Sequence, residues 1–560
     1  MFLDDCSPEE ILEIISQFDN SKASDIPIRV IKKSAHLISP ILASYFNLLM
    51  VEGSFPDVLK VGRVTPIFKK GNLEEVGNYR PVSTLPIFGK IFEKILYSRI
   101  YNFALSQGII DKNQFGFRKS HSTSHAVNYS VKIIEDCLKR KNHVLGIFID
   151  LSKAFDTIDH STLLVKLERY GIRGNANSLI SSYLSNRTQF TEVLGEKSNP
   201  LIIKYGVPQG SVLGPLLFLL YINDISNSSD LGTFILFADD TNIFVEGQSA
   251  EDAYKKGNAL LRSVKNYMLL NKLHINMSKC CYVHFKPKTR ANTPEESKFE
   301  LSIDDFPIKQ SKTAKFLGVV LDEHLSWEPH IAALRRKLNY ASATINRIRD
   351  SIPEDMHTDL YHTLFESHLT YCLSVWGGSS VTNITKIWMA QKHCVRTLFG
   401  NKRAYREKFE TCARARPYPV QVLTNEFYEL EHTKPLFKDR GILALQNLYT
   451  YHTFMEVFKI LKLRCPMSLF DLFNVSSRKE ITLITPLPSN DFICRATSIW
   501  NTIAPKLKLL DYSHSISLAK STLKKALLHI QHSENETSWT QADFDVTRLS
   551  SSIKNEATRA

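Results

Sequence analysis

Short apolar runs between residues 140 and 250 predict buried strands. Residues 144–149 (Val-Leu-Gly-Ile-Phe-Ile) form a run that is brief for a helix and rich in branched side chains. Residues 233–238 and 241–245 have the β-branched and aromatic bias of strands, and Asp239 and Asp240 lie between them. Because Asp tolerates the backbone angles of a tight turn, we predict a hairpin whose tip presents both carboxylates.

Helical periodicity marks the regions on both sides of this stretch. Residues 7–10 (Ser-Pro-Glu-Glu) precede an apolar series, as at a helix start, and we predict helices over residues 8–60. Near the middle of the chain, apolar residues recur at steps of three and four, which predicts one amphipathic helix with the stripe Ile331, Leu334, Leu338, Ala341, Ile345 and Ile348. Its other faces carry Arg335, Arg336, Lys337, Arg347 and Arg349. Taken alone, these charges fit a solvated helix face equally well.

A third carboxylate, Asp150, ends the apolar run at residues 144–149 and precedes the Asp pair by about ninety residues. Carboxylates at strand ends suit Mg²⁺, which binds a few of them together with water and substrate phosphates. Two such ions, about 3.5–4 Å apart, would promote an in-line displacement. Considered alone, however, Asp239-Asp240 is more often a polar turn than a metal site.

Seven blocks in a fixed order change this balance. Around the acids stand residues 148–156 (FIDLSKAFD), 206–215 (GVPQGSVLGP) and 237–240 (FADD). The flanking blocks are residues 78–83 (NYRPVS), 114–118 (QFGFR), 276–279 (NMSK) and 316–318 (FLG). In this order the blocks resemble reverse transcriptases of non-LTR (LINE-type) retrotransposons, in particular the jockey-like group.

The resemblance implies roles for the acidic and aromatic residues. Asp150, Asp239 and Asp240 match the metal-binding triad, which would hold two Mg²⁺, with Mn²⁺ as an alternative. Phe155 matches the aromatic gate that excludes the 2′-hydroxyl of ribonucleotides, so the expected substrates are deoxynucleotides. Gln209 matches the block beside the incoming nucleotide, where glycines let backbone approach a ligand closely. In isolation, residues 208–210 would be read equally well as a glycine turn.

The resemblance also implies cations for the phosphates. Lys69 and Arg80 match the basic residues of the fingers, and Lys70 is an alternative to Lys69. Lys279 matches a lysine that protonates the departing pyrophosphate. Without the family context, each of these residues would be read as a solvated surface charge.

The fold that the resemblance implies is α+β with a right-hand polymerase architecture. We expect a helical N-terminal extension over residues 1–60, fingers and palm over 61–321 (the palm from 143) and a helical thumb over 322–400. Residues 401–532 would be a mostly helical region of unknown role, and residues 533–560 a disordered polar tail. Residues 286–300 would be a polar loop, and basic residues gather at 401–406. Candidates for aromatic contact with nucleic acid are Tyr340, Tyr371 and Trp376, although burial would explain them equally well.

Composition is consistent with a polyanionic partner. The 560 residues carry a net charge of +13 at pH 7, and the sequence pI is about 9.1. Nine cysteines show neither Cys-x-x-Cys nor zinc-knuckle spacing, which indicates no zinc site and a reduced compartment. Residues 215–222, the most apolar run, are too short to span a membrane, and no signal peptide begins the chain. We therefore expect nucleus or cytoplasm, with no membrane contact.

Several polar residues are not expected to perform chemistry. His121 and His125 lie in a block that matches template-contacting fingers, and His160 follows the block of the first Asp. Asp156 lies six residues beyond Asp150 and is expected to make a helix entry or a local hydrogen bond.

The expected activity is RNA-directed DNA polymerisation on an RNA template and a DNA primer. Family members also carry an upstream endonuclease domain, which nothing in this sequence matches. We therefore expect either a partial reading frame or one whose upstream domain has been lost, with an endonuclease supplied in trans as a candidate partner. One alternative is an inactive or co-opted RNA-binding remnant, although clustered carboxylates are costly to keep without a catalytic use. Another is a metal-dependent nuclease, which would leave Phe155 and the phosphate-site cations unexplained.

Overall fold

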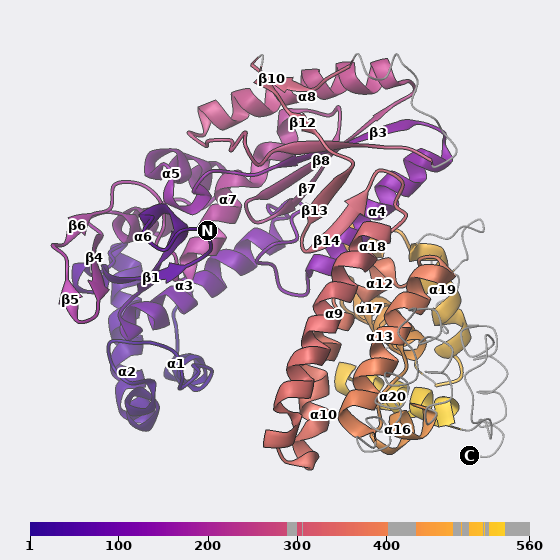
Figure 1. Ribbon diagram of the computed structural model, residues 1–560. Coiled ribbons are helices and arrows are strands. Elements are labelled where there is room, and N and C mark those ends of the chain that lie inside the picture. Colours follow the sequence, from indigo (N-terminus) through magenta and orange to yellow (C-terminus); the bar gives the residue numbers. More distant parts are fainter. Residues whose placement is uncertain are drawn as a thin grey trace. The chain divides into compact units, whose positions relative to one another are not determined.

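The computed structural model describes residues 1–287, 299–304, 306–400, 433–473, 483, 492–507, 509 and 514–532 (Figure 1). Contacts divide the chain into two compact units. The first unit contains residues 1–119, 146–282 and 294–309, and the second contains residues 120–145, 283–293 and 310–560. The predicted basic patch at 401–406, the tail at 533–560 and most of the loop at 286–300 lie outside the described residues.

Helices open the first unit, as predicted. α1 (Pro8–Ser16) begins where the side chain of Ser7 accepts a hydrogen bond from the backbone N–H of Glu10 at 3.3 Å. α2 (Ile28–Glu52) ends at Gly53, whose left-handed backbone (φ 66°) closes the helix. α2 packs against α1 and α6 (Asn175–Leu184).

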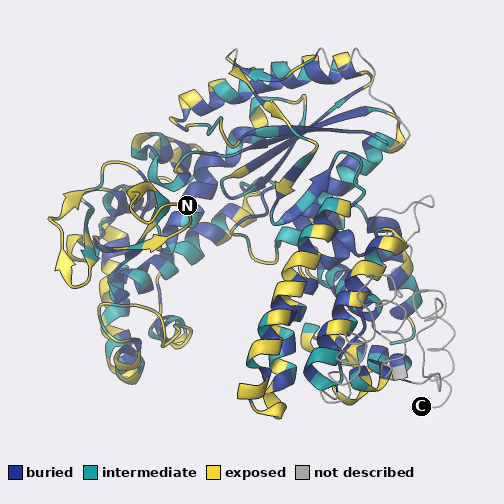
Figure 2. Cartoon of the chain, in the orientation of Figure 1, coloured by how far each residue is buried: buried dark blue, intermediate teal, exposed yellow. Residues whose placement is uncertain are grey.

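α2 also has a second, exposed apolar face. Val30, Leu37, Ile41, Leu48 and Val51 all lie at the surface. Figure 2 shows the chain coloured by the burial of its residues. Among the described residues, α2 is the one helix long and apolar enough to cross a membrane, on length and composition alone. A helix packed on protein passes the same test, so the expected absence of membrane contact stays a prediction.

The first sheet lies in the first unit and contains a hairpin of two long strands. β1 (Val61–Phe68) pairs antiparallel with β2 (Tyr79–Thr84), and Ile67 lies opposite Arg80. On its other side β1 pairs in parallel with β4 (Thr188–Val193), which also pairs with the short strands β5 (Glu196–Lys197) and β6 (Leu201–Ile202). β2 is therefore an edge strand.

The second sheet contains the strands predicted around the acids. Its order is β12-β9-β3-β8-β7, with the bounds β12 (Lys309–Gln310), β9 (Cys281–Phe285), β3 (His143–Ile149), β8 (Asp240–Gly247) and β7 (Thr233–Phe237). Every residue of β3 is buried, as expected of a central strand without polar alternation, and the predicted strand at 144–149 is confirmed.

The first unit also contains several long helices. The main ones are α3 (Ile87–Ser106), α5 (His160–Arg169), α7 (Leu213–Ile222) and α8 (Ala250–Leu270), and α8 lies on β8. Every residue of α7 except Pro215 is buried, so the apolar run at 215–222 is a core helix in contact with α3 and α5. A two-stranded ribbon of β10 (Ser302–Ile303) and β11 (Phe306–Pro307) completes this unit.

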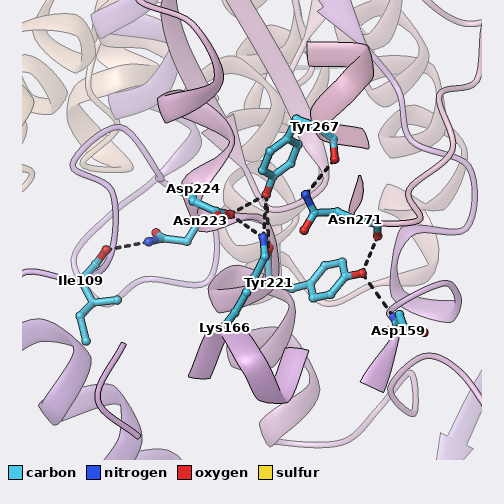
Figure 3. Close-up of polar contacts among 8 residues, drawn as sticks. All are labelled: Ile109, Asp159, Lys166, Tyr221, Asn223, Asp224, Tyr267 and Asn271. Atoms are coloured by element: carbon cyan, nitrogen blue, oxygen red, sulfur yellow. Dashed lines mark hydrogen bonds and ion pairs between the residues drawn. The ribbon is translucent and has the colours of Figure 1, made fainter. Parts of the chain in front are cut away.

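A buried polar network joins α5, α7 and α8 (Figure 3). The ammonium of Lys166 donates to Asp224 Oδ1 at 2.6 Å and to the carbonyl of Tyr221 at 2.7 Å. The hydroxyl of Tyr267 donates to the same carboxylate at 2.7 Å. Burial lowers the pKa of Lys166, and the carboxylate of Asp224 opposes that shift. Because the buried charge has these partners, the network ties three helices together.

The described residues of the second unit are mostly helical. Its longer helices are α4 (Thr123–Lys139), α9 (Glu328–Ile348), α13 (Val381–Phe399), α17 (Leu445–Leu463), α19 (Phe492–Ile503) and α20 (Ile516–His532). Short helices are α10 (His357–Leu360), α11 (Ser367–Leu369), α12 (Leu373–Trp376), α16 (Thr433–Asp439) and α18 (Met467–Phe470). β13 (Thr313–Phe316) and β14 (Val319–Asp322) form a hairpin before α9.

The amphipathic stripe of α9 is confirmed, with one correction. Its apolar members are buried except for Ile348, which is half-buried, and four of the five predicted surface cations are exposed. The fifth, Arg349, is buried in the turn after the helix, where its Nε lies 3.4 Å from Asp350 Oδ1. Of the aromatic candidates, Tyr340 and Tyr371 are exposed, whereas Trp376 is fully buried.

Candidate active site

The Asp pair lies at the tip of the β7–β8 hairpin, but the turn differs by one residue from the prediction. Phe237 pairs with Asp240, so the two turn residues are Ala238 and Asp239, and Asp240 is the first residue of β8. Ala238 adopts the left-handed backbone conformation, with φ at 56°. The turn thus places two successive carboxylates in different positions, one in the turn and one in the strand.

Asp150 follows the adjacent strand β3 and is paired with Lys279. The ammonium of Lys279 lies 2.8 Å from Asp150 Oδ2. The segment that carries Lys279 is held by backbone hydrogen bonds, from Asn276 N–H to the Asp150 carbonyl at 2.9 Å and from Ser152 N–H to the His274 carbonyl at 2.8 Å. The position of the lysine is therefore fixed by the same strand end that carries the acid.

Electrostatic interactions show that the three acids and the predicted cations share one site. Desolvation raises the pKa of Asp239, Asp150 adds to the rise, and Lys69 and Arg80 oppose it. Desolvation raises the pKa of Asp240 to about 6, with further increases from Asp239 and Asp150 and an opposing effect of Lys279. The carboxylates therefore repel one another, and cations from three segments offset part of that repulsion.

This set of acids fits Mg²⁺ only with help from other ligands. Within the described ranges, no group of three or more His, Cys, Asp or Glu side chains is arranged to hold a metal by itself. The three carboxylates nevertheless lie on neighbouring strands of one sheet, at the β7–β8 turn and at the end of the adjacent strand β3. Such an incomplete oxygen site suits an ion that keeps several waters and binds substrate phosphates.

The hairpin of β1 and β2 supplies the two predicted phosphate cations. Lys69 directly follows β1, and its backbone N–H donates to the Asn78 carbonyl at 2.8 Å. Arg80 is the second residue of β2. Both side chains are exposed, which leaves their charges accessible to a ligand.

The ring of Phe155 is held by other rings. It stacks on Phe218 of α7 with centroids 4.7 Å apart and planes at 25°, and it meets Phe117 edge-on at 6.1 Å. The ring is half-buried. These contacts restrict its rotation and keep it in the short helical turn after Asp150.

Gln209 is fixed between two segments of the first unit. Its Nε2 donates to Asp156 Oδ1 at 2.9 Å, and its carbonyl accepts from the backbone N–H of Ser83 at 2.7 Å. Gly206 (φ 81°) and Gly210 (φ 117°) flank it, and a Cβ on either glycine would lie within 2.7 Å of neighbouring backbone atoms. The glycines are thus required by close backbone approach as well as by positive φ.

Comparison with known proteins gives the family of this region. Residues 67–321 match the family model described as "Reverse transcriptase (RNA-dependent DNA polymerase)". We refer to residues 67–321 as the reverse transcriptase domain. All eight predicted site residues lie within this reverse transcriptase domain, and so do the three strands that carry the acids.

The chain is also similar to RNA-directed DNA polymerases of mobile elements. The chain is 28% identical over 410 residues to the probable RNA-directed DNA polymerase from transposon X-element of Drosophila melanogaster. It is 27% identical over 406 residues to the RNA-directed DNA polymerase from mobile element jockey of the same organism. Each alignment covers 70% of this chain and 44% of the relative, so the chain spans less than half the length of these proteins.

A solved structure shows only a weak overall similarity. The structure of apo telomerase from Candida tropicalis, truncated from its C-terminal domain, matches with a TM-score of 0.33 and 13% identity. The match covers 51% of this chain and 59% of that one. The secondary structure of the reverse transcriptase domain is mixed α/β, as the strands and helices above show.

The polar residues set aside in the sequence have structural partners. His160 donates from Nε2 to the Gly206 carbonyl at 2.8 Å. Asp156 lies in a short helical turn and its backbone N–H bonds the Lys153 carbonyl, as expected, but its side chain also accepts from Gln209, which is distant in sequence. In the second unit, His121 lies 3.4 Å from the sulfur of Cys465, and burial lowers the pKa of His125 to about 4. None of these side-chain contacts could be read from the sequence blocks.

Proposed function

We propose that the reverse transcriptase domain is an RNA-directed DNA polymerase that adds deoxynucleotides to the 3′ end of a DNA primer on an RNA template. The observation that carries the proposal is the meeting of three acids with Lys69, Arg80 and Lys279 around one hairpin turn. Nucleotidyl transfer requires this combination, because the same site must bind a polyanionic triphosphate and stabilise developing charge.

Asp150, Asp239 and Asp240 would hold Mg²⁺, or Mn²⁺ in its place. When bound, two such ions would lower the pKa of the primer 3′-hydroxyl and offset charge on the pyrophosphate. The carboxylates orient the reactants by fixing this charge at the strand ends of the second sheet. Their raised pKa values are the expected cost of gathering acids for that purpose.

The cations act on the triphosphate. Arg80 can contact two phosphate oxygens at once through its planar guanidinium, whereas Lys69 supplies a point charge. Lys279 holds its ammonium at the edge of the acid cluster and would donate a proton to the departing pyrophosphate oxygen. Lys70 remains an alternative to Lys69.

Phe155 and Gln209 would bind the sugar and base side of the nucleotide. The ring of Phe155 is braced by Phe218 and would block a 2′-hydroxyl. Gln209 is fixed by Asp156 and would contact the incoming nucleotide. Both assignments follow from the resemblance of their blocks, and the contacts keep the two side chains in place.

The right-hand architecture is part of the same proposal. Residues 61–142 would be the fingers, 143–321 the palm and 322–400 a thumb whose basic helix α9 follows the template–primer duplex. The partners would be RNA template, DNA primer and deoxynucleotides, with an endonuclease acting in trans, and the compartment nucleus or cytoplasm. No role is assigned to residues 401–560.

Primer extension tests the proposal. The full chain should extend a DNA primer on an RNA template only with Mg²⁺ or Mn²⁺, and Asp239→Ala with Asp240→Ala should lower the rate by about 10³-fold or more. Asp230→Ala, an exposed acid in the loop before β7, is the matched control and should extend normally. Unchanged extension by the double variant would refute the metal assignment. If the wild-type chain binds RNA but does not extend the primer, an inactive RNA-binding remnant is the better explanation. If it cleaves nucleic acid without extending the primer, a metal-dependent nuclease is the better explanation.

A further inference from the structure

Gln114 lies beside the acidic turn, although none of the predicted roles includes it. Gln114 is almost completely buried, with 1% of its surface exposed. Its side-chain oxygen accepts two backbone hydrogen bonds, from Gly116 N–H at 2.8 Å and from Ala238 N–H at 3.1 Å. Ala238 directly precedes Asp239, so one carboxamide oxygen joins the segment around Gln114 to the turn that carries the acids.

The backbone around Gln114 continues this contact along β7. Phe115 N–H donates to the Leu236 carbonyl at 2.8 Å, and Leu236 N–H donates to the Asn113 carbonyl at 3.0 Å. The approach is close, because a Cβ on Gly116 would lie 2.2 Å from the Ala238 nitrogen. The segment 113–116 therefore leaves the turn no room to move in its direction.

This segment is itself anchored. The guanidinium of Arg118 donates to the carbonyls of Asp111 at 2.8 Å and Gln114 at 3.1 Å. The side chain of Asn223, just after α7, accepts from Asp111 N–H at 2.8 Å. It also donates to the Ile109 carbonyl at 2.7 Å (Figure 3). The support for the turn thus reaches back to the buried helix α7.

The turn needs such support. Ala238 is an alanine with φ at 56°, a left-handed conformation that residues other than glycine rarely adopt. Ala238 also lies outside the strand pairing, which ends at Phe237 and Asp240. A hydrogen bond to its buried N–H both satisfies that group and selects the left-handed conformation.

We propose that Gln114 is a positioning residue of the polymerase site: its carboxamide oxygen holds Ala238 and so orients the carboxylate of Asp239 toward the reactants. The inference rests on the proposed polymerase function. Gln114 touches no substrate and acts through the turn. Its loss should therefore reduce the chemical step and metal affinity, and leave template–primer binding unchanged.

Gln114→Met removes the acceptor at nearly constant volume. We expect kcat for primer extension to fall by about 10–100-fold, as for small misplacements of catalytic groups, with the KM for deoxynucleotide within about threefold of wild type. Direct titration of the chain with Mn²⁺ by calorimetry should show affinity weakened several-fold. Wild-type kcat and Mn²⁺ affinity in the variant would overturn the proposal.

Two further variants separate positioning from general destabilisation. Asn177→Leu removes a side chain that bonds the carbonyls of Leu164 and Ile172 elsewhere in the first unit, and it should lower Tm with little effect on kcat per folded molecule. If its kcat falls as far as that of Gln114→Met, the proposal fails. Gln114→Glu keeps an acceptor oxygen, and burial favours its neutral form, so it should lose less kcat than Gln114→Met. Equal losses would also overturn the proposal.

The readouts remain informative if one variant does not fold or the polymerase proposal fails. If Gln114→Met is unfolded by circular dichroism, Gln114→Asn carries the same test, because it keeps the amide but withdraws it by one methylene. A wild-type chain without extension refutes the proposed function. The Mn²⁺ titration then still decides whether Gln114 supports the acids.

Discussion

The carboxyl group of Asp240 has a raised pKa. Desolvation and the charges of Asp239 and Asp150 raise its pKa to about 6, so the folded chain binds this proton more tightly than the unfolded chain does. The ionised group therefore destabilises the fold above pH 6. That destabilisation is lost as the pH falls from about 6 towards 4, where the unfolded carboxylate begins to bind protons as well.

Asp240→Asn should consequently raise Tm slightly at pH 8 in the absence of divalent metal, because it removes one of three mutually repelling charges and solvent screens this exposed residue. The gain should shrink between pH 6 and pH 4. Thermal unfolding monitored across this range measures both effects. A gain that stays constant with pH would show that repulsion is not its cause.

Phe155 allows a second test at this scale. Phe155→Ala should lower the preference for deoxynucleotides over ribonucleotides at least about tenfold, because the ring held by Phe218 no longer fills the 2′ side of the site. Single-nucleotide extension with each substrate gives the ratio of kcat/KM values. Phe155→Tyr keeps the ring and should keep the preference, and an unchanged ratio in Phe155→Ala would remove this residue from the gate.

At the residue scale, the sequence blocks identified the candidate catalytic side chains but not the residues that hold them in place. Asp150, Asp239 and Asp240 stand in short motifs whose order is visible in the chain. Gln114 and Asp156 each bond a partner more than fifty residues away, and no local pattern encodes such a pair. A glutamine in the block at 114–118 was visible, but only the fold brings it to Ala238.

At the scale of elements, local pattern predicted several of the strands and helices within each unit. The apolar run at 144–149 and the stripe of α9 were both predictable because each follows one period along the chain. The parallel pairing of β1 with β4 was not predictable, since these strands are separated by more than a hundred residues. The turn was off by one residue because Ala238 rather than the second Asp occupies the left-handed position.

The loop around Gln209 provides a test of element packing. Gly206→Ala should destabilise the first unit by about 2–3 kcal/mol, because it combines positive φ with a Cβ placed 2.7 Å from the backbone of Asp156. Gly195 has a similar φ of 89° with open space around it, so Gly195→Ala should cost only about 1 kcal/mol. Urea unfolding compares the two. Equal costs would mean that the close approach to Asp156 has no effect.

At the scale of the whole molecule, the net charge of +13 should make template–primer binding strongly dependent on salt. If α9 follows the duplex, replacing the exposed residues Arg335, Arg336 and Lys337 with Ala should lower the slope of log Kd against log salt by about 2. Fluorescence anisotropy with a labelled duplex measures the slope. Replacing Lys520, Lys524 and Lys525 on α20 changes net charge equally and should leave the slope nearer that of wild type.

The burial of β3 affects the order in which parts of the fold open on heating. Amide hydrogens along a fully buried central strand exchange with deuterium only when the whole unit opens, whereas those of the edge strand β2 exchange through local fraying. Asp150 therefore follows a strand that opens last, whereas Arg80 lies on an edge strand that opens early. Mild heating should therefore weaken the grip on nucleotide before it disturbs the acids, so that KM rises at temperatures where kcat is still intact.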